Sequence, residues 1–215
     1  MSQTLVETFK KDILMIYVFL ATGFEEIEAL TPIDIMRRAG LEVVTVSVTG
    51  DKTVVGTHGV PVTADILLGE ADFAAAEMLV LPGGLPGSTN LDACAELRKG
   101  IQTVYEAGKP LAAICAAPMV YGHMGLLKGV RATCYPGCES HMEGAVYTAS
   151  IVEQDGQLAG KEQHYTAAHH AHQQKESQEH HGTKLAHSLH VSPPIFWILR
   201  IRGYKAAMAA KLSSQ

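Results

Sequence analysis

Cys115 lies in a segment typical of a nucleophile elbow, the sharp turn that joins a strand to a helix and exposes a reactive side chain. The apolar run Leu111–Ile114 leads into it, and Ala113 and Ala117 stand two residues before and after it. So tight a turn presses the flanking positions together, and only glycine or alanine leaves room there. The turn also places the sulfur at a helix N-terminus, where the dipole favours the thiolate. The alternative is a structural cysteine, because free cysteines are often buried.

Two other segments could supply partners for this sulfur. Glu28 has apolar neighbours in an expected helix, so burial could keep its carboxyl group protonated. A protonated carboxyl that donates a hydrogen bond favours the thiolate, and the two acids then titrate as a coupled pair. The loop Pro82-Gly83-Gly84 follows a buried apolar run and could present backbone N–H donors. The alternatives are an exposed helix carboxylate and a plain turn, and the loop lacks the spacing of nucleotide-binding glycine loops.

The elements that must position these residues begin with a strand–helix–strand unit. We expect a buried strand over residues 12–20, a helix from Glu25 to Ala39 and a strand over residues 41–48. Pro32 lies inside the helical pattern and predicts a kink. Such a unit is the mark of a parallel sheet, so the fold class is α/β.

The remaining elements are shorter. We expect short strands over residues 52–68, a buried strand over residues 77–81, the elbow strand before Cys115, and strands over residues 130–134 and 145–154. Ser88 or Asn90 should cap a helix that ends near Ala107. Asp155-Gly156 predicts a tight turn near the end of this series.

The bulk composition predicts one globular domain that binds no nucleic acid. The chain has 215 residues, 47% of them hydrophobic, and a formal net charge of -5 with no basic face. Its four cysteines are too few and too scattered for a disulfide scaffold, which favours a reducing compartment. Only Cys134 and Cys138 are close in sequence, and without a second pair they give weak support for zinc. We therefore expect no metal site and no cofactor.

No targeting or membrane segment is expected. The N-terminus has no basic region followed by an apolar one, so it does not resemble a signal peptide. The longest apolar runs, Ile13–Leu20 and Ile195–Leu199, are far shorter than the ~20 residues that span a bilayer. The sequence therefore predicts a cytoplasmic protein with no membrane partner.

Three motifs occur in a characteristic order: Gly23–Glu28, Leu81–Gly84 and Ala113–Pro118. With Arg37–Gly40 and Ala132–Gly137, they resemble the DJ-1/ThiJ/PfpI family. The resemblance implies a flavodoxin-like α/β sandwich, similar to class I glutamine amidotransferases, with a central, mostly parallel sheet and a nucleophile elbow. It also implies a homodimer.

The resemblance assigns a role to four residues. Cys115 matches the reactive cysteine, and Glu28 matches the protonated glutamate that hydrogen-bonds its thiolate. Gly84 and Ala116 match the positions whose backbone N–H groups face the substrate oxygen. In a peptidase branch of the family a histidine directly follows the cysteine; here that residue is Ala116, so we expect no peptidase.

Two hypotheses from different classes follow. In the first, the protein is a cofactor-independent glyoxalase or deglycase, and Cys115 attacks a methylglyoxal-like dicarbonyl or its glycated adduct to form a hemithioacetal. Glu28 would then shuttle a proton to yield a hydroxy acid, with Gly83 and His58 as possible pocket residues; His58 could also simply occupy a turn. In the second, the protein is a redox-responsive, chaperone-like or oxidative-stress binding protein in which Cys115 is oxidised to a sulfinate.

The C-terminal part departs from the family pattern. After Leu158 we find neither the Gly-Pro loop nor the long helix of the family, which affects the expected pocket wall and one sheet edge. Eight of the eleven histidines instead fall between His164 and His190. We therefore expect a DJ-1/PfpI-like domain over residues 11–160 and a poorly ordered tail over residues 161–215. A polar tail or an altered reading frame is favoured over metal binding, because no ligand geometry is defined.

Overall fold

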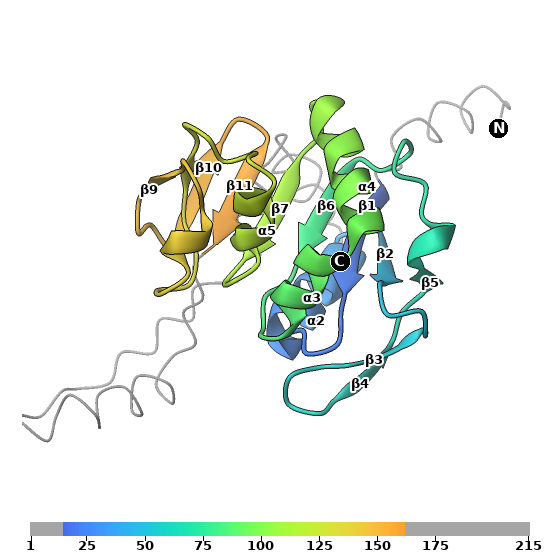
Figure 1. Ribbon diagram of the computed structural model, residues 1–215. Coiled ribbons are helices and arrows are strands. Elements are labelled where there is room, and N and C mark those ends of the chain that lie inside the picture. The colour runs from blue at the N-terminus through green and yellow to red at the C-terminus, as the bar shows by residue number, and fades with distance from the viewer. Residues whose placement is uncertain (1–14, 162–215) are drawn as a thin grey trace, which may run out of the picture.

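The computed structural model describes residues 15–161, which form a seven-stranded, mostly parallel sheet with helices on both faces (Figure 1). The strand order is β10-β11-β7-β6-β1-β2-β5, and only the pair β10–β11 is antiparallel within this sheet. Its strands are β1 (Met15–Leu20), β2 (Glu42–Ser47), β5 (Ile66–Leu67), β6 (Met78–Leu81), β7 (Leu111–Ile114), β10 (Val152–Asp155) and β11 (Leu158–Lys161). The predicted flavodoxin-like α/β sandwich is thus confirmed.

Among the described residues, two small strand pairings lie outside the main sheet. The antiparallel pair is β3 (Thr53–Val55) with β4 (Pro61–Thr63), and the parallel pair is β8 (Arg131–Ala132) with β9 (Val146–Tyr147). The helices are α2 (Glu26–Arg38), α3 (Gly87–Ala93), α4 (Ala95–Glu106) and α5 (Pro118–His123), with single 3-10 turns η2 (Leu68–Glu70) and η3 (Glu139–His141). Within residues 15–161, no helix is both long enough and apolar enough to cross a membrane.

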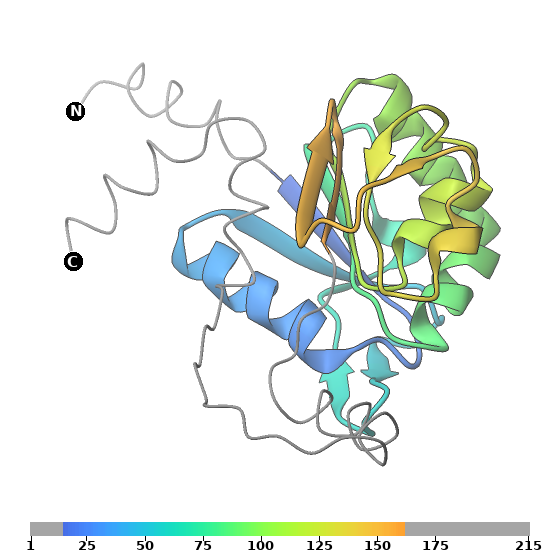
Figure 2. The same ribbon diagram turned by 90° about the vertical axis from the view of Figure 1, so that its left-hand side faces the viewer.

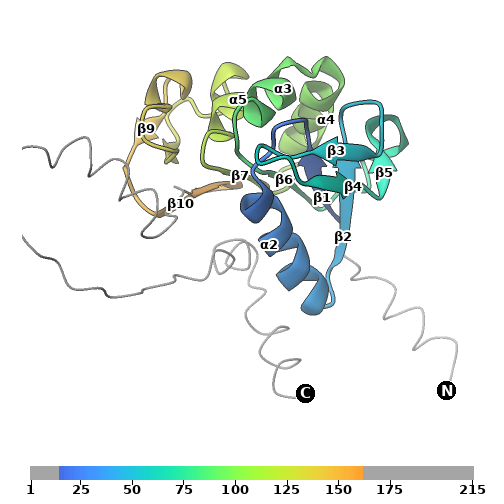
Figure 3. The same ribbon diagram turned by 90° about the horizontal axis from the view of Figure 1, so that it is seen from below.

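The central strands are buried on both faces, which explains their continuous apolar sequences. Alternate residues of β1 point to opposite sides: Phe19 belongs to the core beneath α3, α4 and α5, and Val18 to the core beneath α2. Figures 2 and 3 show α2 on one side of the sheet and the other three helices on the opposite side. Pro32 lies inside α2 without ending the helix.

The predicted single helix from Ser88 or Asn90 to Ala107 is wrong. Two helices, α3 and α4, occupy this stretch, and Cys94 between them has an extended backbone. Leu91 and Leu97 are both fully buried, although six positions on one straight helix would set them roughly 120° apart. The break lets both side chains face the core. Neither Ser88 nor Asn90 caps α3, which begins at Gly87 after Pro86.

The sequence placed one sheet edge in doubt after Leu158, and the structure describes a strand there. Residues Leu158–Lys161 form β11, which lies between β7 and β10 and pairs with both. The predicted turn Asp155-Gly156 is present, and Gly156 adopts φ 57° between the two strands. The rest of the predicted tail lies outside the described residues, and so do residues 11–14 of the predicted domain.

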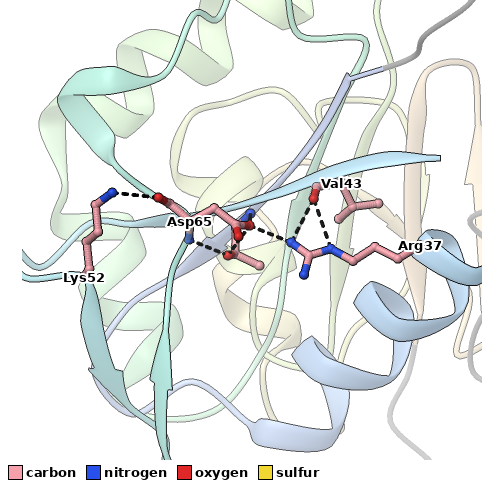
Figure 4. Close-up of polar contacts among 5 residues, drawn as sticks. Arg37, Val43, Lys52 and Asp65 are labelled. Carbon is pink, nitrogen blue, oxygen red and sulfur yellow. Dashed lines mark hydrogen bonds and ion pairs between the residues drawn. The ribbon is translucent and has the colours of Figure 1, made fainter. Parts of the chain in front are cut away.

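Arg37 links the C-terminal end of α2 to β2 and to the residue directly before the edge strand β5 (Figure 4). Its guanidinium donates to the Val43 carbonyl at 2.9 and 3.2 Å and to the Asp65 carboxylate at 2.6 Å. Asp65 also accepts from the N–H and hydroxyl of Thr45, both at 2.7 Å. Burial opposes ionisation of Asp65, but these Thr45 and Arg37 donors outweigh it and lower the pKa of the carboxyl.

Candidate functional site

Cys115 lies on a strained turn between β7 and α5, as the elbow pattern predicts. Its φ of 61° is in the left-handed region, which costs a non-glycine residue about 1–2 kcal/mol. The flanking Ala113 and Ala117 are fully buried, so larger side chains would not fit there. The Cys115 carbonyl accepts the Tyr135 N–H at 2.7 Å, and this contact helps to hold the turn. The surrounding structure therefore imposes the strained conformation.

Glu28 and the loop after β6 meet Cys115 in one buried cluster. The Cys115 sulfur hydrogen-bonds the Glu28 side chain and receives the backbone N–H groups of Gly84 and Ala116. The Gly83 N–H donates to Glu28 Oε2 at 2.8 Å. Glu28 and Cys115 are only 3% and 7% exposed. The structure thus brings together Cys115, Glu28, Gly83, Gly84 and Ala116, which all lie where the sequence predicts a site.

The first turn of α2 fixes the position of Glu28. Glu25 caps this helix, and its carboxylate accepts the Glu28 N–H at 2.8 Å. The Glu25 N–H in turn donates to the Gly83 carbonyl at 2.9 Å, so the loops after β1 and β6 are joined. Gly84 has φ 93°, and a side chain there would come within 2.5 Å of the Glu25 nitrogen. These loops follow the carboxyl ends of parallel strands, where ligands bind in open α/β sheets.

Burial raises the pKa of the Cys115 thiol, and the neighbouring Glu28 carboxylate raises it further. The N–H groups of Gly84 and Ala116 act in the opposite direction. The net direction is opposite to the lowering expected from the helix dipole, because the sulfur is enclosed and faces another acid. Two adjacent buried anions are unfavourable, so the pair retains one proton between its two groups. A thiolate forms when that proton resides on Glu28.

The match to a family model decides the identity of the fold. The model of the DJ-1/PfpI family matches residues 15–173, nearly three quarters of the chain. The chain belongs to the DJ-1/PfpI family.

Named relatives of this DJ-1/PfpI chain come from several kingdoms. Protein DJ-1 homolog B of Arabidopsis thaliana is 37% identical over 161 residues, which cover 74% of this chain but 35% of the plant protein. The chain therefore spans about a third of the length of that relative. A deglycase of Pyrococcus abyssi is 32% identical over 134 residues, covering 61% of this chain and 78% of the archaeal protein.

Solved structures agree with this assignment. A DJ-1 superfamily protein from Salmonella typhimurium superposes with a TM-score of 0.67 at 36% sequence identity. The match covers 69% of this chain and 81% of the bacterial one. The family fold therefore applies to the described part of this DJ-1/PfpI chain.

His58 is paired with Glu26 in this DJ-1/PfpI chain. Its Nδ1 lies 2.8 Å from Glu26 Oε2, and its backbone N–H donates to Oε1 at 2.7 Å. The carboxylate raises the pKa of His58, and despite burial the hydrogen bonds from His58 lower the pKa of Glu26. Ligand atoms of Glu25, Glu26 and His58 lie within 4.8 Å of one another, so these three could hold a cation. The sequence left His58 as either a pocket residue or a turn residue, and it did not predict this pairing.

Two supporting residues were missed from the sequence. Glu25 stands three positions before Glu28, which is the spacing of a helix cap, so capping rules could have identified it. Tyr135 acts through its backbone N–H, a contact that no residue type signals in advance.

Proposed function

We propose that this DJ-1/PfpI protein is a cysteine-dependent enzyme of the glyoxalase or deglycase type. Its substrates would be methylglyoxal-like dicarbonyls or their glycated adducts. The observation that carries the proposal is the set of groups around the Cys115 sulfur: the Glu28 side chain and the N–H groups of Gly84 and Ala116 all hydrogen-bond it. A nucleophile, a proton carrier and two oxyanion donors are thus within one buried cluster. The archaeal relative named as a deglycase supports the same class of chemistry.

The first step forms a hemithioacetal. The Cys115 thiolate attacks the aldehyde carbon, and the electron pair of the C=O bond moves to oxygen. Glu28, which holds the pair's single proton, gives it to that oxygen. The N–H groups of Gly84 and Ala116 would stabilise the negative charge as it leaves sulfur and develops on oxygen.

The second step moves hydrogen between the two substrate carbons. The Glu28 carboxylate removes the proton from the sulfur-bearing carbon and returns it to the neighbouring carbon through an enediol, while the hydroxyl proton of the hemithioacetal passes to the neighbouring carbonyl oxygen. The product is a thioester of Cys115, which water cleaves to release a hydroxy acid and the free thiol. The balance is one dicarbonyl plus one water to one hydroxy acid, so no redox cofactor takes part.

Turnover of methylglyoxal by the purified full-length protein tests this proposal. Cys115→Ala should abolish formation of lactate, and Glu28→Gln should reduce it at least about 100-fold because the amide cannot shuttle the proton. Asp34→Asn is a matched control, since Asp34 is an exposed carboxylate on the same helix that pairs with Arg38. Full activity of Glu28→Gln would contradict the mechanism.

A role as an oxidation sensor is the second candidate. The same N–H groups of Gly84 and Ala116 that contact the sulfur could receive the oxygens of a Cys115 sulfinate. Glu28→Gln separates the two functions, because it should slow turnover about 100-fold or more while mass spectrometry still detects oxidation of Cys115 by peroxide. Stoichiometric oxidation without any turnover in the parent protein would favour the sensor.

We also propose that the protein is a homodimer in the cytoplasm. Light scattering coupled to gel filtration measures the first property, and fractionation of cells measures the second. A monomer at micromolar concentration would overturn the proposed assembly.

A further inference from the structure

A second cluster of titratable side chains lies apart from the Cys115 cluster. Asp92 of α3, Arg98 of α4, His123 at the end of α5 and His141 of η3 form a continuous chain of polar contacts. Three helices and a 3-10 turn thus bring together residues that are 18 and 31 positions apart in sequence. None of the proposed chemistry at Cys115 uses these groups.

Asp92 orients the ring of His123. Arg98 contacts Asp92 Oδ1, and His123 Nδ1 lies 2.7 Å from Asp92 Oδ2. Because a carboxylate accepts hydrogen bonds, it places the proton of a neutral His123 on Nδ1. The lone pair is then on Nε2, which faces away from Asp92. A carboxylate that fixes the tautomer of an imidazole in this way is the usual outer partner of a metal-binding histidine.

His141 presents a second imidazole nitrogen to that lone pair. Its Nδ1 is 3.1 Å from His123 Nε2. Two nitrogens that each lie ~2.0–2.1 Å from a zinc ion in tetrahedral geometry are roughly 3.3–3.4 Å apart. The observed separation of the two nitrogens is therefore within a few tenths of an ångström of the separation in such a chelate. Without an ion, the same distance fits a hydrogen bond from His141 Nδ1–H to His123 Nε2.

The backbone holds the two histidines in this arrangement. Gly122, directly before His123, packs against η3 so closely that a Cβ there would collide with the His141 carbonyl and come within 2.8 Å of the Met142 Cα. Arg98 also donates to the His123 carbonyl at 3.2 Å. The imidazoles are thus positioned by main-chain packing as well as by their own contacts, which is the preorganisation that a ligand site needs.

We propose that His123 and His141 bind one divalent transition-metal ion of the zinc type, with Asp92 as a positioning residue. Imidazole is a favoured ligand for these ions, and water would complete the coordination. Binding requires that the proton on His141 Nδ1 move to its Nε2, so both imidazoles bind as neutral ligands. The site is independent of the function proposed for Cys115.

The test must distinguish these histidines from the eight between His164 and His190. Zinc chloride is titrated into the full-length protein while side-chain nitrogen NMR signals of individual histidines are followed. His123 and His141 should shift together with one shared affinity. If saturating zinc leaves these two rings unchanged, the contact is a hydrogen bond only and the proposal fails.

Variants give a second measurement. His141→Gln should weaken binding of zinc at His123 at least tenfold, and Asp92→Asn should weaken it about 10-fold to 100-fold, as loss of an outer-shell partner does. His172→Gln, which also removes one imidazole, should leave zinc binding at His123 unchanged. Equal affinity at His123 in the parent and in His141→Gln would overturn the chelate.

Discussion

Gly83→Ala should disrupt the Cys115 cluster through one added methyl group. Gly83 does not adopt a left-handed φ, so alanine can occupy its backbone conformation and the effect is purely one of packing. The new Cβ would collide with Glu28 Oε2, and it would lie 2.6 Å from the Cys115 Cβ and 2.9 Å from the Ile114 carbonyl. Ordinary contacts between carbon atoms are ~3.5–4.0 Å, so the loop or Glu28 must shift by on the order of 1 Å.

Both stability and reactivity should respond to this shift. Overpacking a well-filled interior typically costs about 1–3 kcal/mol of the free energy of unfolding. At roughly 2–4 °C per kcal/mol for a chain of this size, the melting temperature should fall measurably. The shift also separates the Gly83 N–H from Glu28, a hydrogen bond of 2.8 Å. A displacement of ~1 Å commonly costs about 100-fold in rate, so turnover and alkylation of Cys115 should both slow.

Gly69→Ala is the matched control. A Cβ at Gly69 meets nothing within 4 Å and its φ is not left-handed, so the same substitution should be neutral or slightly stabilising. Calorimetry measures the melting temperatures, and mass spectrometry measures the alkylation of Cys115. If Gly83→Ala behaves like Gly69→Ala in both assays, the close packing of Gly83 against Glu28 and Cys115 is not what positions the pair.

Three further predictions concern backbone strain and pH. Cys115→Gly should be more stable than Cys115→Ala by about 1 kcal/mol in urea unfolding, since glycine tolerates the left-handed φ; equal stabilities would show that the turn carries no strain. Because the folded pKa of Asp65 is lowered, its contribution to stability is present above the unfolded value of ~3.9 and is lost as the pH falls through the folded pKa. Asp65→Asn should therefore reduce the loss of unfolding free energy as the pH falls into the acid range, and an unchanged loss would refute this. Glu26→Gln should return the raised pKa of His58 toward its ordinary value in an NMR titration, whereas a shift in the opposite direction would refute the pairing.

The features that could be predicted from the sequence are those that leave a local pattern in it. The order of the motifs around Glu28, Gly84 and Cys115 predicted their convergence, because loops at the carboxyl ends of parallel strands meet at one edge of the sheet. The buried strands were predicted by their continuous apolar runs. The raised pKa of Cys115 could not be predicted from the sequence, since it depends on how fully the folded protein buries the sulfur.

Features that depend on long-range packing could not be predicted. The break at Cys94 follows from the need to bury Leu91 and Leu97 together, which only the finished core imposes. The cluster of Asp92, His123 and His141 has no motif spacing, because its members come from separate elements. The strand β11 is only four residues long, so its sequence carries little strand signal. Its position is set by its pairing with β7 and β10.

The position of β11 between β7 and β10 has a consequence for synthesis on the ribosome. The strand that completes one side of β7 ends 47 residues after β7 itself, at Lys161. At ~5–20 residues per second, the nascent chain contains β7 for roughly 2–10 s before its neighbour exists. During that interval the wholly apolar segment Leu111–Ile114 presents unpaired N–H and C=O groups on one side, the kind of edge on which chains aggregate. Slower translation between residues 114 and 161 should therefore lower the yield of folded protein.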